Sequence, residues 1–104
     1  MTFVDTNMIY CFDLDNTLCK TVGENYLDAV PYEDRIDKVN KLGEKNYIII
    51  DTARGTQTGT DWQYKTEAQL KRWGLNYDSL RTGKKVYADY YIDDKGFNSE
   101  EFFK

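Results

Sequence analysis

Histidine is absent from this chain of 104 residues, and its absence excludes every mechanism that needs an imidazole base or metal ligand. Cysteine is scarce: Cys11 and Cys19 match no zinc spacing and do not suggest a disulfide framework. No apolar stretch approaches the length of a membrane span, and the N-terminal segment shows neither a basic leader nor a cleavage site. We therefore expect a cytoplasmic protein whose chemistry uses carboxylates, hydroxyls, lysine and arginine.

An excess of positive charge is also missing, since 14 Lys and Arg stand against 18 Asp and Glu, for a net charge of -4. Nucleic-acid affinity depends largely on clustered Lys and Arg that contact phosphates. We therefore expect neither a nucleic-acid nor a membrane partner. The length and the 40% hydrophobic content suit one globular domain over residues 1–104.

Three short apolar runs, at 8–12, 47–50 and 86–92, each end in polar residues. Runs of this kind, rich in β-branched and aromatic residues, predict buried strands. Weaker patterns predict a short strand at 77–80 and a final helical turn from Asn98 or Ser99. The chain therefore carries several short strands, three of them strongly indicated.

Two segments between these runs, 30–46 and 60–75, have apolar residues at helical spacing. Pro31 fits the first position of the first helix, and Gly43 and Gly74 are plausible stops. Strands that alternate with helices predict an α/β fold with parallel pairing and right-handed crossovers.

Ligands of open parallel sheets bind outside the carboxyl ends of the strands. That rule brings seven polar residues to one rim: Asp13, Asp15, Thr17, Thr52, Arg54, Asp93 and Asp94. Carboxylate pairs from two strand ends, without imidazole, form a hard oxygen-ligand site that suits Mg²⁺. The divalent charge offsets the repulsion between neighbouring carboxylates.

The stretch DLDNT at 13–17 resembles the DxDxT signature of the haloacid dehalogenase-like (HAD) hydrolase superfamily. The later motifs follow in that family's order: a strand ending in Thr52, a lysine, and a strand ending in Asp93-Asp94. The resemblance implies a three-layer, Rossmann-like parallel sheet with flanking helices and a minimal cap or none. It also implies a Mg²⁺-dependent phosphatase that works through an aspartyl-phosphate.

The resemblance assigns roles to the residues of these motifs. Asp13 is the nucleophile, and Asp15 is the general acid and then the general base. The catalytic lysine is either Lys84, which fits the family's pattern better, or Lys85. The phosphate-binding residues are Thr52, Ala53, Arg54 and Lys84. The metal ligands are Asp13, Asp15, through its backbone carbonyl, Asp93 and Asp94.

Neither position where the family inserts a cap domain has room for one, and 19–30 resembles the family's short squiggle and flap. The site is therefore expected to be open unless a homo-oligomer covers it. The TARG and IDDK stretches are similar to small capless members associated with capsular polysaccharide biosynthesis. A sugar phosphate or similar small phosphomonoester is therefore the expected substrate.

Two other functions stay open at the level of the sequence. A response-regulator receiver also combines acids, Mg²⁺, threonine and lysine, and here Asp51 would be its phosphoacceptor. A catalytically silent domain that binds a sugar phosphate is the third reading. Asp51 itself has no clear role in the phosphatase, beyond pointing into the rim or pairing with Arg54.

Overall fold

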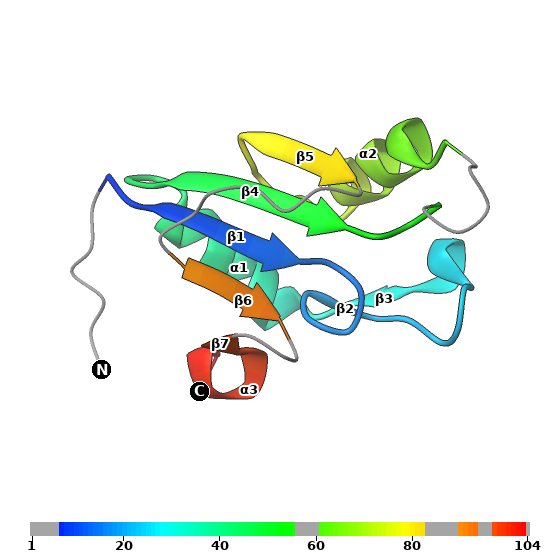
Figure 1. Ribbon diagram of the computed structural model, residues 1–104, viewed down its shortest axis with the longest axis horizontal. Coiled ribbons are helices and arrows are strands. Elements are labelled where there is room, and N and C mark those ends of the chain that lie inside the picture. The colour runs from blue at the N-terminus through cyan, green and yellow to red at the C-terminus, as the bar shows by residue number, and fades with distance from the viewer. Residues whose placement is uncertain (1–6, 56–60, 83–89, 94–96, 104) are drawn as a thin grey trace.

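A five-stranded parallel sheet is the centre of the fold, in a computed structural model that describes residues 7–55, 61–82, 90–93 and 97–103 (Figure 1). The strand order is β5-β4-β1-β6-β7, and each neighbouring pair is parallel. The strands are β1 Ile9–Asp13, β4 Tyr47–Thr52, β5 Ser79–Thr82, β6 Tyr90–Asp93 and β7 Phe97–Asn98. The predicted α/β class with parallel pairing is confirmed.

The central strand β1 is buried on both faces, which explains why its sequence is apolar without alternation. Tyr10 and Phe12 point into the main core, where each is fully buried. Cys11 lies on the opposite face of the sheet and packs with Ile49 in a smaller cluster. β1 thus contributes side chains to the apolar clusters on both faces of the sheet.

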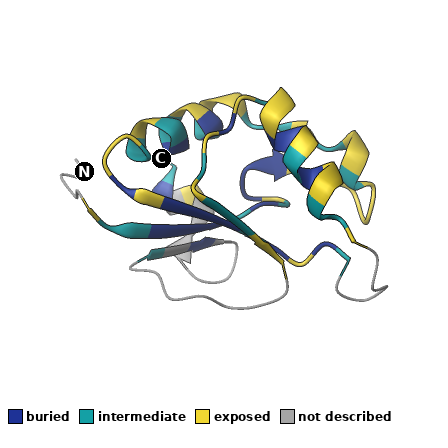
Figure 2. Cartoon of the chain, turned by 90° about the horizontal axis from the view of Figure 1, so that it is seen from above, coloured by how far each residue is buried: buried dark blue, intermediate teal, exposed yellow. Residues whose placement is uncertain are grey.

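The helices α1 Glu33–Leu42 and α2 Gln63–Arg72 cover one face of the sheet (Figures 1 and 2). Ile36, Val39 and Leu70 project from them into the main core, as their helical spacing predicts. Within the described ranges no helix lies against the opposite face. The described part is therefore two-layered, and the third layer of the expected architecture stays a prediction.

The first helix begins later than expected, at Glu33, and the placement of Pro31 inside it is wrong. Pro31 belongs to β3 Val30–Pro31, which pairs antiparallel with β2 Cys19–Lys20. The fixed φ of proline suits an extended residue as well as a helix start, and the pairing with β2 decides between the two. The Tyr32 N–H also donates to the Leu18 carbonyl at 2.9 Å, which keeps this segment beside the turn after β1.

The two glycines end their helices for different physical reasons. Gly74 has φ +72°, a left-handed conformation that favours glycine, so this predicted stop is confirmed. Gly43 is right-handed, with φ −66°. A Cβ at Gly43 would lie 3.3 Å from Ile48 Cγ1, so a larger residue there would require the Ile48 side chain to shift by a few tenths of an ångström.

The weaker sequence patterns are also confirmed, with shifted bounds. β5 takes the place of the strand expected at 77–80, and α3 Ser99–Phe102 begins at Ser99. The expected strand at 86–92 is observed as β6 from Tyr90, and its first residues lie outside the described ranges. No helix in the described part of the chain is both long and apolar enough to cross a membrane.

The connection from β1 to α1 contains β2, β3 and the single 3-10 turn η1 Tyr26–Asp28. This segment, residues 19–31, lies beyond the carboxyl end of β1 (Figure 1), and we call it the flap. The flap is far smaller than a domain, as expected for a chain with no cap at this position.

Candidate functional site

The parallel register brings the predicted acidic strand ends to the same edge of the sheet. Asp13 closes β1 directly beside Asp51 of β4. Phe12 pairs with Ile92, so Asp13 and Asp93 each follow a paired residue on neighbouring strands. Backbone positions about eighty residues apart in the chain therefore meet at one rim. Lys84, Lys85 and Asp94 lie outside the described residues.

Thr52 and Ala53 follow at the end of β4, on the same edge. Thr52 is buried, and its Oγ1 accepts the backbone N–H of Arg54 at 3.3 Å. A hydroxyl that accepts this bond keeps its own O–H as a donor, which suits a contact to a phosphoryl oxygen. Ala53 is exposed at the rim.

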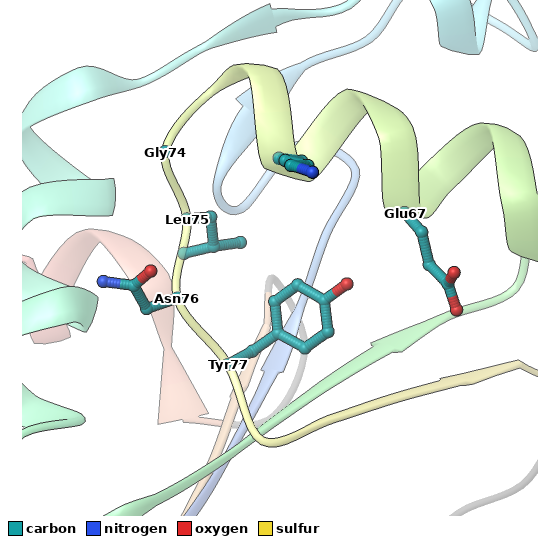
Figure 3. A pocket seen from close by; sticks show the side chains of 6 residues that line it. Glu67, Gly74, Leu75, Asn76 and Tyr77 are labelled. Carbon is teal, nitrogen blue, oxygen red and sulfur yellow. The ribbon is translucent and has the colours of Figure 1, made fainter.

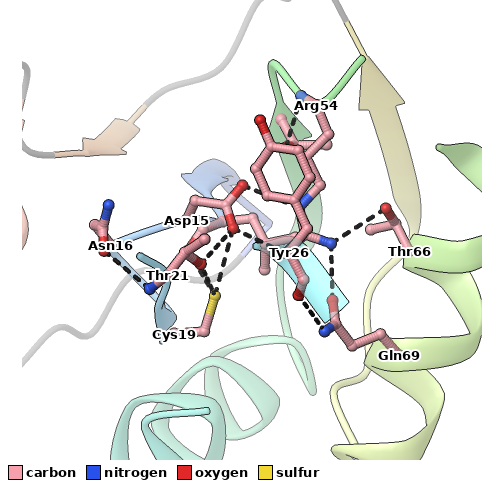
Figure 4. A network of polar contacts seen from close by, with 10 residues as sticks. Asp15, Asn16, Cys19, Thr21, Tyr26, Arg54, Thr66 and Gln69 are labelled. Carbon is pink, nitrogen blue, oxygen red and sulfur yellow. Dashed lines mark hydrogen bonds and ion pairs between the residues drawn. The ribbon is translucent and has the colours of Figure 1, made fainter. Parts of the chain in front are cut away.

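Asp15 is held by a two-pronged ion pair with Arg54 (Figure 4). Arg54 Nε donates to Asp15 Oδ2 at 3.0 Å, and Nη2 donates to Oδ1 at 2.8 Å. The hydroxyl of Thr21 in the flap also donates to Asp15 Oδ1, at 2.7 Å. The Arg54 side chain is 0% exposed and that of Asp15 is 21% exposed, so Asp15 is the partner that solvent can reach.

The rest of the Arg54 guanidinium is bound by α2 and the flap (Figure 4). Nη1 donates to Gln69 Oε1 at 2.7 Å and to Thr66 Oγ1 at 3.3 Å. Gln69 in turn donates from Nε2 to the Tyr26 carbonyl at 2.7 Å. The Tyr26 ring centroid lies 4.8 Å from Arg54 Cζ, in a cation–π contact. The guanidinium is thus directed at protein groups, and its direct contact with phosphate stays a prediction.

Sequence reasoning placed Thr66 on the buried stripe of the second helix and did not single out Gln69. Both side chains are buried in the structure, at 0% and 1% exposure. Buried polar side chains are almost always hydrogen-bonded. A polar residue on an apolar helix stripe was therefore the signal for a buried polar partner, here Arg54.

The turn after β1 also buries the threonine of the DLDNT motif. Thr17 is fully buried, and its Oγ1 has no hydrogen-bond partner among the contacts of the described residues. Asn16 adopts φ +63°, and its Oδ1 accepts the Thr21 N–H at 3.1 Å. A buried hydroxyl without a partner is costly, so this turn is a place where a further polar group is expected.

The rim contains oxygen atoms that could hold Mg²⁺. Within the described residues, no group of three or more His, Cys, Asp or Glu side chains gathers as a metal site. The Asp15 carboxylate is bonded to Arg54 and Thr21, which leaves its backbone carbonyl as the donor that the family resemblance implies. That carbonyl, half-buried Asp13 and the end of β6 at Asp93 supply oxygen donors alone, which suits a hard cation.

Asp51 does not pair with Arg54, so that alternative from the sequence is wrong, because Arg54 is bound to Asp15. In the sheet Asp51 lies beside Arg81 of β5. Burial nevertheless raises the pKa of the Asp51 carboxyl, and this outweighs the opposing effects of the Thr52 N–H and of Arg81. Asp51 is therefore a half-buried carboxyl whose charged form loses more from burial than it gains from Arg81 and the Thr52 N–H.

Asp51→Asn is expected to stabilise the folded protein at about pH 7. A carboxyl whose pKa is higher in the folded state makes that state bind more protons than the unfolded chain. Stability therefore falls as pH rises through the folded pKa, and the asparagine removes this loss. Below about pH 3, where both states are protonated, the gain should vanish. Urea unfolding at both pH values measures it, and an equal gain at both would contradict the role of desolvation.

Both cysteines are free and buried, in agreement with the expectation that they form no disulfide. Cys19 lies close to Asp15, with Sγ 3.8 Å from Oδ1. Burial raises the pKa of the Cys19 thiol, which keeps it in the unreactive neutral form. Cys19 is therefore a packing neighbour of the site.

A pocket of about 400 Å³ lies toward the amino ends of the strands, opposite the predicted site, where the chain leaves α2 and approaches the start of β5 (Figure 3). Its lining residues are Glu67, Lys71, Gly74, Leu75, Asn76 and Tyr77. None of them belongs to the predicted site. A concavity at the amino ends of the strands is on the wrong edge for the usual ligand position of a parallel sheet.

No family model and no curated protein matches the chain. A crystal structure of an MCSG target from Vibrio cholerae is similar to it, with a TM-score of 0.70 and 25% sequence identity. The match covers 92% of this chain and 87% of that chain. The similarity supports the α/β fold over nearly the whole length and assigns no activity.

Proposed function

We propose that this protein is a Mg²⁺-dependent phosphomonoester hydrolase of the HAD type that works through an aspartyl-phosphate. One observation carries the proposal: Asp13 and Asp93 end the neighbouring strands β1 and β6, where the order of the sheet reverses. From β1 the chain builds outward through β4 to β5, and then continues on the other side with β6 and β7. Such a switch point is where open α/β sheets bind their ligands.

The strand order also separates this proposal from the receiver alternative. Counted along the chain, the five strands of the main sheet lie in the order third, second, first, fourth, fifth. All five follow the Rossmann order 3-2-1-4-5, whereas receivers have the flavodoxin-like order 2-1-3-4-5. In that alternative Asp51 would have to be the phosphoacceptor. Asp51 lies on β4, the second strand of the main sheet counted along the chain. The topology therefore supports the hydrolase.

The residues at the rim suit the two chemical steps of such an enzyme. In the first step a carboxylate oxygen of Asp13 forms a bond to phosphorus as the ester P–O bond breaks, and Asp15 gives its proton to the departing oxygen. In the second step Asp15 takes a proton from the attacking water, and the bond between Asp13 and phosphorus breaks to release phosphate. Thr52 and the lysine, Lys84 or Lys85, stabilise the phosphoryl oxygens.

Asp13, Asp93 and the Asp15 carbonyl would hold the magnesium ion, with Asp94 contributing directly or through water. When bound, Mg²⁺ offsets the repulsion between an anionic nucleophile and an anionic ester. Positioning and charge neutralisation do most of the work in phosphoryl transfer. The buried polar anchoring of Asp15 agrees with that requirement.

The substrate class is a small phosphomonoester, and a sugar phosphate of polysaccharide biosynthesis is the first candidate. The open site expected without a cap would admit such a substrate, and Val22, Leu27 and Val30 of the flap are 68%, 54% and 62% exposed. Such apolar side chains beside the rim suit contact with the organic part of a substrate or with a second subunit. The homo-oligomer stays a prediction to be sought on this surface.

The proposal predicts that the covalent phosphate forms on Asp13. Wild-type protein with Mg²⁺ is first screened for phosphate release from sugar phosphates, nucleotides and aryl phosphates. The intermediate formed from the best substrate is then trapped by acid quench and reduced with borohydride, and the modified aspartate is located by peptide mapping. Modification of Asp13 supports the hydrolase. Modification of Asp51 supports the receiver instead, and substrate binding without phosphate release supports the silent binding domain.

A further inference from the structure

Arg54 connects the carboxyl of Asp15 to the buried face of α2. Its Nε and Nη2 donate to both oxygens of Asp15, at 3.0 and 2.8 Å. Its Nη1 donates to Gln69 at 2.7 Å and to Thr66 at 3.3 Å. One planar group is therefore fixed from two directions by residues about fifty positions apart in the chain, with the Tyr26 ring against it.

This arrangement constrains the orientation of Asp15 more than a single contact would. A two-pronged pair fixes the plane of a carboxylate as well as its position. The guanidinium itself has little freedom to rotate, because Gln69 is 1% exposed and bonded at its other end to the Tyr26 carbonyl at 2.7 Å. Lysine has one compact charge and lacks this fork, so it would not reproduce the geometry.

The exposure of the two partners is also unequal. The Arg54 side chain is 0% exposed, whereas that of Asp15, which follows β1, is 21% exposed. A buried charge is strongly destabilising unless it is paired and hydrogen-bonded, and this one is both. The result is a rigid buried support beneath one accessible carboxyl.

We propose that Arg54 and Gln69 are positioning residues, which fix the Asp15 carboxyl in the orientation needed for proton transfer to the leaving oxygen. Asp15 donates in its protonated form, with the proton on Oδ2, which accepts from Arg54 Nε, whereas Oδ1 accepts from Arg54 Nη2 and Thr21. This inference rests on the proposed phosphatase function. General acid catalysis is effective only when the acid lies within hydrogen-bond reach of the oxygen that receives the proton. Loss of the support therefore slows proton transfer while Asp13, Thr52 and the lysine are unchanged.

Two esters of nearly equal shape differ in how much the leaving group needs a proton, so comparing them isolates the proton-transfer step from substrate binding and nucleophilic attack. Phenyl phosphate releases a phenoxide that is basic, with a conjugate-acid pKa of about 10, and needs the proton. p-Nitrophenyl phosphate releases p-nitrophenoxide, which is a far weaker base and departs readily without a proton. Because kcat/KM reports steps only through cleavage of the ester, the later role of Asp15 as a base does not enter the comparison.

The test measures kcat/KM on both esters, with Mg²⁺, for wild type, Arg54→Lys and Gln69→Met. We expect Arg54→Lys to lose about 100-fold on phenyl phosphate and less than about threefold on p-nitrophenyl phosphate. Gln69→Met keeps the ion pair and is expected to lose about tenfold, with the same selectivity. Arg72→Met, which removes an exposed charge at the end of the same helix, is the control and should match wild type on both.

Thermal melting of each variant separates folding from chemistry, and Gln69→Met carries the test if Arg54→Lys does not fold. Equal losses on the two esters, or no loss in a folded variant, would overturn the positioning role while leaving the phosphatase intact. If wild type with Mg²⁺ hydrolyses no phosphomonoester, the proposed function fails, and the positioning role fails with it. The two failures are therefore distinguishable.

Discussion

Asp13→Asn is expected to abolish phosphatase turnover, with a loss of about 10⁴-fold or more in kcat. An amide oxygen is a poor nucleophile, so no acyl-phosphate forms and the two-step route is closed. The position of Asp13 at the end of β1, beside the ends of β4 and β6, makes it the carboxylate around which the rim is organised. Phosphate release under saturating substrate and Mg²⁺ measures the loss.

The fold is expected to survive this change, because asparagine has nearly the same shape as aspartate and one fewer charge stands beside Asp51. Melting temperature and circular dichroism check that point. Asp37→Asn, at an exposed residue of α1 outside the predicted site, removes the same charge and should leave turnover unchanged. Undiminished turnover in folded Asp13→Asn would eliminate Asp13 as the nucleophile and with it the proposed mechanism.

Periodicity in the sequence was enough to predict the central elements of the fold. The centres of the runs at 8–12 and 47–50, residues 10–12 and 48–50, are buried on both faces, and such a stretch must be apolar throughout. Helical spacing identified the buried side of α1, where Ile36 and Val39 enter the core. These patterns are local and are set by burial, so a single sequence carries them.

The start of the first helix illustrates what local patterns leave out. Pro31 is compatible with a first helical turn and with an extended strand, and its own sequence context favours the helix. The deciding interaction is the β2–β3 pairing, which joins Pro31 to Cys19 twelve residues earlier. A choice made by tertiary contact is not visible in the periodicity of either segment.

The candidate site shows the same division. The acidic residues at strand ends were predictable because parallel strands deliver their carboxyl ends to one edge. The partner of Arg54 was not predictable in this way, since the same residue suits phosphate, Asp51 or Asp15. The choice depends on how the flap and α2 pack around the guanidinium, which brings Asp15, Thr66 and Gln69 to it.

The second large effect concerns the metal. Removal of Mg²⁺ with EDTA is expected to abolish turnover, and added Mg²⁺ is expected to restore it. Without the cation, Asp13 would stand near Asp51 and an anionic ester. Arg54 is already paired with Asp15, so the lysine and Arg81, which lies beside Asp51, would have to offset this charge. Phosphate release measured against Mg²⁺ concentration gives the requirement directly.

Asp93→Asn tests whether the carboxylate at the end of β6 is a ligand of Mg²⁺. β6 is the neighbour of β1, so the loss of a carboxylate at Asp93 should raise the Mg²⁺ concentration for half-maximal activity by about tenfold or more. Ca²⁺ should support turnover poorly, because it prefers longer bonds and more ligands than Mg²⁺. Asp61→Asn, at an exposed residue two positions before α2, is the matched control. Full activity in EDTA would show that turnover does not depend on a cation and would contradict the proposed role of Mg²⁺.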